Sequence, residues 1–120
     1  MMIEYESCHQ EGVLLLFSDL PAVHMGIPVR QLLSAYELLP ERHLYVWQHH
    51  EKVVGVIGIH KQKQTFAVHH ISVHPSFRNQ GIGSSLVHGV QELHLHLAMC
   101  STQETKHFLN KCWQKQSLLG

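Results

Sequence analysis

The stretch that decides the fold of this 120-residue chain is residues 71–84, which read ISVHPSFRNQGIGS. The segment 66–73 has the pattern of a strand that Pro75 ends, and it is followed by a loop with one arginine and two glycines. In residues 82–93 one helical stripe carries the apolar side chains, which are Ile82, Leu86, Val87, Val90 and Leu93. The order predicts a strand, a tight loop and a helix that begins at the loop.

The loop, residues 78–84, has the properties of a diphosphate-binding site. The first turn of a helix presents backbone N–H groups without intrahelical partners, and these attract anions. Gly81 and Gly83 let the backbone approach an anion and adopt positive φ, and Arg78 adds a permanently charged donor. The dinucleotide pattern GxGxxG fails at Leu86, and GxxxxGK[ST] is absent. The alternative for these residues alone is a tight turn without a ligand.

The rest of the chain predicts a mixed α/β or α+β domain. The expected elements are a strand at 2–6, a helix at 8–18, a helix from Pro28 to before Pro40, strands at 43–49, 53–59 and 66–73, the helix at 82–93, a strand at 95–99 and a helix at 103–114. Strands 43–49, 53–59 and 66–73 should form an antiparallel meander. Strands 66–73 and 95–99, joined by a helix, should lie parallel.

Composition indicates one globular domain over residues 1–120. The formal net charge is zero and apolar residues make up 44% of the chain, so a nucleic-acid partner and disorder are not expected. Residues 61–120 carry six of the nine Lys/Arg but two of the nine Asp/Glu, which suits an anionic ligand. The acidic N-terminus and the short apolar runs predict neither a signal peptide nor a membrane segment. Three cysteines without a CxxC, which are Cys8, Cys100 and Cys112, suggest reduced thiols and a cytoplasmic protein.

The pattern Val73-x-Pro75-x-x-Arg78-x-x-Gly81-x-Gly83 resembles the acetyl-CoA signature of the GCN5-related N-acetyltransferases, the GNAT family. The predicted element order resembles that family too, from its first strand to its fourth helix. The resemblance implies a GNAT-like fold that stops after the fourth helix and lacks the last two strands. A narrower likeness, in residues 44–47, 54–58, 70–83 and 108–112, is to small members encoded in riboflavin operons of bacilli.

The resemblance implies an acetyl-CoA-dependent N-acetyltransferase that acts on a small amine. A pantetheine arm would pair with the strand backbone, the loop amides and Arg78 would hold the diphosphate, and the thioester would lie between strands 66–73 and 95–99. The implied binding residues are Ile71, Ser72, Val73, Arg78, Asn79, Gln80, Gly81, Ile82, Gly83 and Ser84. No metal is implied. The alternative function is a CoA-binding regulatory module with little turnover.

Three positions depart from the family pattern. Leu109 stands where many members have a tyrosine acid, Thr102 where many have an asparagine, and Ala67 where some have a glutamate base. His69 and His70 lie on the same strand and should face opposite sides of the sheet. A histidine with a pKa near ~6.5 can accept a proton from an ammonium group, so His70 is the predicted base. The alternative is that His70 only packs inside the sheet.

Thirteen histidines raise the question of a metal site. The candidate pairs are His49-His50, His69-His70 and His94-x-His96. Adjacent residues of a strand point to opposite faces, so the two adjacent pairs should not share an ion. His94 and His96 could share a face if both lie on a strand, but no cysteine or carboxylate stands directly beside them in the sequence to complete a site, so no metal site is predicted. The open edge beside strand 95–99 is expected to be covered by a second copy, giving a homodimer, or by the tail 115–120.

Overall fold

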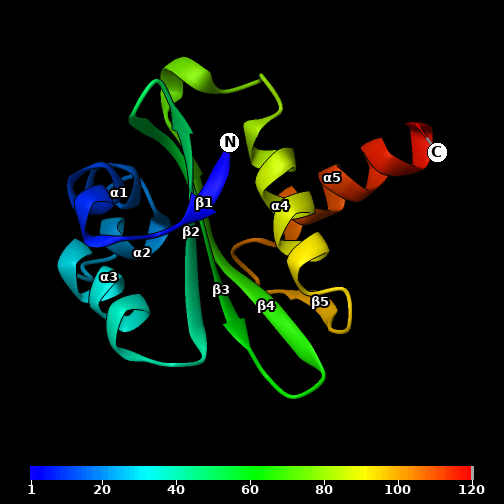
Figure 1. Ribbon diagram of the computed structural model, residues 1–120, viewed down its shortest axis with the longest axis horizontal. Helices are drawn as coiled ribbons and strands as arrows, with labels where there is room; N and C mark the ends of the chain where they lie inside the picture. Colours follow the sequence, from blue (N-terminus) through cyan, green and yellow to red (C-terminus); the bar gives the residue numbers. More distant parts are fainter. Residues whose placement is uncertain (120) are drawn as a thin grey trace.

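The fold is built on one five-stranded sheet with helices on both faces (Figure 1). The computed structural model describes residues 1–119, with side chains described as far as residue 112. The strands are β1 (Met2–Glu4), β2 (Arg42–His49), β3 (Lys52–Lys61), β4 (Thr65–Val73) and β5 (Ala98–Ser101). Their order in the sheet is β1-β2-β3-β4-β5. The mixed α and β architecture predicted from the sequence is confirmed.

Strand direction follows the prediction. The pairs β1–β2, β2–β3 and β3–β4 are antiparallel, and β4–β5 is parallel. The β2–β3 hairpin turns through His50 and Glu51, whose φ angles of 49° and 67° are both positive. A turn with two positive φ angles has a backbone twist that matches the right-handed twist of the two strands that it joins.

The helices divide between the two faces of the sheet (Figure 1). On one face lie α1 (Gln10–Phe17), α2 (Pro21–His24) and α3 (Val29–Leu38), and on the other α4 (Ile82–Leu93) and α5 (Lys106–Leu119). Pro28 occupies the position before α3, where its missing N–H costs nothing. Each face has its own apolar core. Val13, Phe17, Leu33 and Val46 belong to the first, and Ile57, Phe66, Leu86 and Leu109 to the second.

A shift in the β3–β4 register changes which side chains of β4 face which core. Gly58 pairs with His70 and Ile59 with Val68, so His69 has no partner in β3, as in a β-bulge. Val68 therefore packs in the α4–α5 core, while His70 faces the α1–α3 side. Gly58 leaves room for the ring of Tyr36, which packs closely above it.

The sequence placed β5 three residues too early. Residues 94–97 form a turn in which His94 Nδ1 lies 2.8 Å from the Val90 carbonyl oxygen, and the Leu97 amide donates to the His94 carbonyl. These bonds end α4 and delay the strand to Ala98. Leu93, predicted on the buried stripe of α4, is 55% exposed because it lies at this end of the helix.

Helix α5 also begins three residues later than predicted. Thr102 and Thr105 bond to each other through backbone amide and side-chain oxygen, and the helix starts after that turn, at Lys106. Leu109 and Cys112 are buried as expected for the apolar stripe. Trp113 and the tail 115–120 lie outside the residues whose side chains are described. No helix in the described part of the chain combines the length and apolar character needed to cross a bilayer.

Candidate active site

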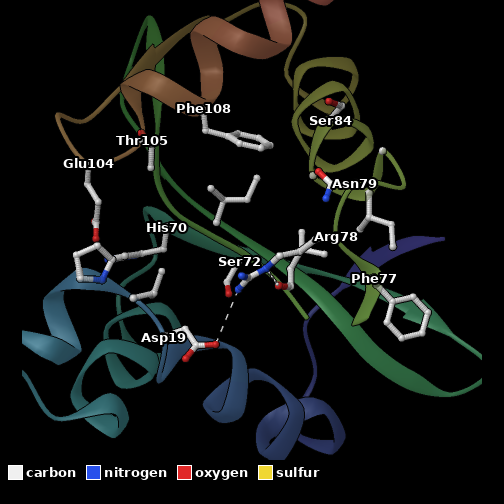
Figure 2. A pocket seen from close by; sticks show the side chains of 17 residues that line it. Asp19, His70, Ser72, Phe77, Arg78, Asn79, Ser84, Glu104, Thr105 and Phe108 are labelled. Carbon is white, nitrogen blue, oxygen red and sulfur yellow. Dashed lines mark hydrogen bonds and ion pairs between the residues drawn. The ribbon is translucent and has the colours of Figure 1, made fainter. Parts of the chain in front are cut away.

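A cleft of about 460 Å³ opens between the end of β4, the start of α4, the α1–α2 connection and the start of α5. Figure 2 shows Arg78, Asn79 and Ser84 toward one end of this cleft, and His70, Glu104 and Thr105 toward the other. Its walls are therefore built from segments that are far apart in the sequence, and they are joined by the sheet. Apolar side chains such as Phe108 and Ile71 line the space between the polar ends.

The loop between β4 and α4 turns through two residues with left-handed backbone. Asn79 has φ 64° and Gly81 has φ 83°. Helix α4 begins at Ile82, directly after Gly81, and the first amides of a helix have no partner inside it. Gly81, Ile82, Gly83 and Ser84 all line the cleft. The loop thus directs the positive end of α4 at the cleft, which is the geometry that binds a diphosphate.

The two glycines of the loop serve different purposes. A Cβ at Gly81 would meet no atom within 4 Å, so the requirement there is the positive φ. A Cβ at Gly83 would lie 2.5 Å from Cζ of Phe108. Gly83 therefore allows the Phe108 ring of α5 to pack against the first turn of α4.

Arg78 lies across the end of β4. Its Nε donates to the Val73 carbonyl oxygen at 3.0 Å, and its guanidinium is 4.0 Å from the Asp19 carboxylate. The side chain is 53% exposed. The charge is therefore available to an anion at the mouth of the cleft.

Among the described residues, no strand pairs with one edge of β4 along the cleft. Pairing with β5 ends at Val68–Ser101, whereas β4 continues to Val73. At the point where the strands part, the buried Thr105 hydroxyl donates to the Val68 carbonyl oxygen at 2.7 Å. Beyond that bond, an extended ligand can add to β4 as another strand does.

His70 is buried and hydrogen-bonded on the α3 side of the site. Its Nδ1 lies 2.6 Å from the Tyr36 hydroxyl. Burial raises the pKa of Tyr36 well above its usual value, so the phenol keeps its proton at neutral pH. Burial, with smaller contributions from His69 and Arg42, lowers the pKa of His70 to about 4. His70 is therefore neutral at pH 7 and a weak proton acceptor, and the base role expected from the sequence stays a prediction.

Two carboxylates line the cleft. Asp19, on the α1–α2 connection, contacts Arg78. Glu104 lies between β5 and α5. Partial desolvation raises the pKa of its carboxyl group, and a hydrogen bond from the backbone amide of Ala22 opposes part of that rise. Glu104 makes no ion pair within 4.0 Å among the residues whose side chains are described.

The structure brings together almost all binding residues that the sequence predicted. Every one of them lines the cleft except Gln80, whose side chain reaches back to the Ser76 carbonyl oxygen. Sequence reasoning missed Asp19, Glu104, Thr105 and Phe108. Asp19 precedes a Leu-Pro break in the chain, and Thr105 lies at the start of a helix, but neither signal points to a site by itself.

The other sequence candidates lie apart from the cleft. The rings of His49 and His50 stack edge to face, and His94 packs among Tyr45, His43 and Phe66. No three His, Cys, Asp or Glu side chains are grouped to hold a metal in the part of the chain described. Cys8 and Cys100 are exposed free thiols, and Cys112 is buried.

Comparison with known proteins is consistent with this cleft. The sequence model of the Acetyltransferase (GNAT) family matches residues 11–115. An uncharacterized N-acetyltransferase in the lysA 3′ region of Bacillus methanolicus is 30% identical over 113 residues, 93% of this chain and 94% of the relative.

Solved structures share the fold at low sequence identity. A transcriptional regulator from Bacillus halodurans superposes with a TM-score of 0.75 at 16% identity, over 97% of this chain and 90% of its own. AAC(6′)-Iy, in complex with the bisubstrate analog CoA-S-monomethyl-acetylneamine, gives a TM-score of 0.75 at 14% identity, over 97% and 87%. The fold implied by the sequence resemblance is confirmed.

Proposed function

The chain belongs to the Acetyltransferase (GNAT) family and is an acetyltransferase with acetyl-CoA as its co-substrate, and from that premise we propose that it acetylates a small primary amine in the cleft beside β4. The observation that carries the proposal is the continuity of three features. The free edge of β4, the left-handed loop at Asn79 and Gly81, and the first turn of α4 border one cleft.

Each feature suits one part of the co-substrate. Backbone groups of β4 from Ile71 to Val73 would pair with the amides of the pantetheine arm. The loop amides and Arg78 would bind the diphosphate. The thioester would then lie where β4 and β5 part, next to Thr105. Held there, its carbonyl carbon can be attacked directly by an amine from the open side of the cleft.

The experiment is a thermal-shift and turnover pair on the purified chain. Acetyl-CoA and CoA should both stabilise the protein, by about 2.7 kcal/mol at 100 times Kd, and ADP should stabilise it less. Release of CoA thiol from acetyl-CoA is then followed with a panel of primary alkylamines and with water alone. Binding without thiol release would favour the regulatory module, and no stabilisation by either CoA species would contradict the proposal.

We also propose which kind of amine the protein acetylates. The resemblance of residues 44–47, 54–58, 70–83 and 108–112 to RibT, an acetyltransferase-like protein of riboflavin operons, supports an amine connected with riboflavin metabolism. Turnover with amine intermediates of flavin synthesis in the panel tests it, and equal rates with unrelated alkylamines would contradict it.

The cellular setting and assembly are proposed on separate observations. The free thiols of Cys8 and Cys100 support the reducing cytoplasm. Residues 1–120 are proposed to act as one catalytic domain.

The exposed edge strand β5, four residues long, supports a homodimer in which a second copy covers it. Light scattering that gives a monomer at high concentration would contradict the dimer.

A further inference from the structure

Transfer of an acetyl group to an amine needs a group that removes the ammonium proton, and β4 does not offer a strong proton acceptor. Ala67 cannot accept a proton. The Nδ1 of His70 is engaged with the Tyr36 hydroxyl, and burial lowers the pKa of the ring to about 4, so His70 is a weak proton acceptor. A proton acceptor from another element of the cleft would complete the site.

Glu104 is the carboxylate best placed for this task. Asp19, the other carboxylate that lines the cleft, lies 4.0 Å from the guanidinium of Arg78, which is expected to bind the diphosphate. Glu104 lies beside Thr105, at the point where β4 and β5 part. Figure 2 shows Glu104 and His70 on the same side of the cleft, and the Glu104 charge is close enough to Tyr36, the hydrogen-bond partner of His70, to raise the pKa of the phenol.

Accordingly, we propose that Glu104 is the general base of the acetyl transfer, an inference that rests on the proposed function. The Glu104 carboxylate takes a proton from the ammonium group of the acceptor. The nitrogen lone pair attacks the thioester carbonyl carbon, a C–N bond forms, and the C–S bond breaks. The thiolate leaves and takes a proton from the new nitrogen through water, and Glu104 returns its own proton to solvent. The products are the acetamide, CoA thiol and one proton.

The environment of Glu104 suits a base that works on a cation. An exposed carboxylate in a cleft with few other acids attracts an ammonium group and can still release its proton to water. Partial desolvation raises its pKa toward the working range, which improves proton transfer. The acceptor is thus expected to be an amine that arrives protonated.

The substitution Glu104→Gln separates a catalytic role from a structural one. The glutamine side-chain oxygen can still accept from the Ala22 amide, which the carboxylate approaches in the structure, but the amide cannot take a proton. The matched control is Glu92→Gln, which removes an exposed carboxylate outside the cleft. CoA thiol release is measured for the wild type and both variants with primary alkylamines and with water, and CoA affinity by calorimetry.

A general base contributes about 10²- to 10⁴-fold to the rate, so Glu104→Gln should lose at least a hundredfold in kcat/KM at unchanged Kd for CoA. Glu92→Gln should match the wild type. Unchanged thiol release in Glu104→Gln overturns the inference and leaves the proposed function standing. A wild type that binds acetyl-CoA but releases no thiol with any acceptor also overturns it. A wild type that does not bind acetyl-CoA overturns the proposed function itself.

Discussion

The hydroxyl of Tyr36 on α3 lies 2.6 Å from Nδ1 of His70 on β4, and both side chains are buried. This bond ties the α3 side of the sheet to the strand that borders the cleft. It also holds the His70 ring in one orientation on the α3 side of the sheet. The sequence could place each residue on its element, but it could not indicate that the two side chains meet.

The first prediction concerns the stability of the fold as pH falls. His70 has a pKa of about 4 when folded, below the unfolded value of ~6.5, so the unfolded chain binds more protons between these values. Its contribution is present above pH ~6.5 and is lost as pH falls toward 4, by at most about 3 kcal/mol. Urea unfolding at pH 7 and pH 4.5 measures the loss, which His70→Gln should reduce.

A control separates His70 from its neighbour. Burial also lowers the pKa of His69, which is less buried. His69→Gln should therefore change the pH dependence less than His70→Gln. Equal pH dependence in the wild type and His70→Gln would show that His70 is not a buried neutral group.

The second prediction concerns Arg78. Removing its guanidinium in Arg78→Ala should weaken binding of both CoA and acetyl-CoA about ten- to a hundredfold, because a charge-assisted contact of roughly 1.5–3 kcal/mol is lost. The side chain is more than half exposed, so salt should screen the contact and shrink the difference. Calorimetry at two salt concentrations checks both effects. A loss confined to acetyl-CoA would place Arg78 at the acetyl group instead.

The third prediction concerns the conformation of Gly81. Gly81→Val should abolish CoA binding at any salt concentration, because a branched side chain would stand where the backbone meets the diphosphate. The positive φ should also cost about 1–3 kcal/mol of stability, although no protein atom obstructs the new Cβ. Calorimetry measures the CoA affinity of this variant, and urea unfolding measures its free energy of unfolding. Unchanged CoA affinity would contradict the whole functional assignment.

The fourth prediction tests the contact between Gly83 and Phe108. Gly83→Ala should destabilise the protein because the added Cβ would lie 2.5 Å from the Phe108 ring, which must move. The double variant with Phe108→Ala should recover part of that loss, since the obstacle is gone. A double-mutant cycle of unfolding free energies measures the coupling. Additive losses would mean that the ring does not restrict position 83.

The fifth prediction concerns the buried hydroxyl of Thr105. Thr105→Val keeps the shape but removes the donor to the Val68 carbonyl oxygen, and the unsatisfied group should cost about 1–3 kcal/mol. Thr105→Ser keeps the hydroxyl and is the control. If the two variants unfold at the same urea concentration, the bond adds nothing to stability.

Much of the site was predictable because it is local in sequence. The strand end, the arginine and the two glycines all lie within the twelve consecutive residues from Val73 to Ser84. The physical demands of that turn, which are a positive φ at Gly81 and free amides after it, select residue types that can be recognised directly. Boundaries set by side-chain bonds, such as the late start of β5 after His94, were missed.

The sequence by itself determined the order of the strands and of the longer helices, the parallel crossover and the glycine-containing loop before α4, because periodicity and turn chemistry act between near neighbours. Only the tertiary structure decided what faces that loop. The register shift at His69 turns His70 toward Tyr36, and the packing of the helices on the sheet brings Asp19 and Glu104 into one cleft. Such contacts join residues more than 30 positions apart, and they follow from how the sheet and helices pack rather than from any local pattern.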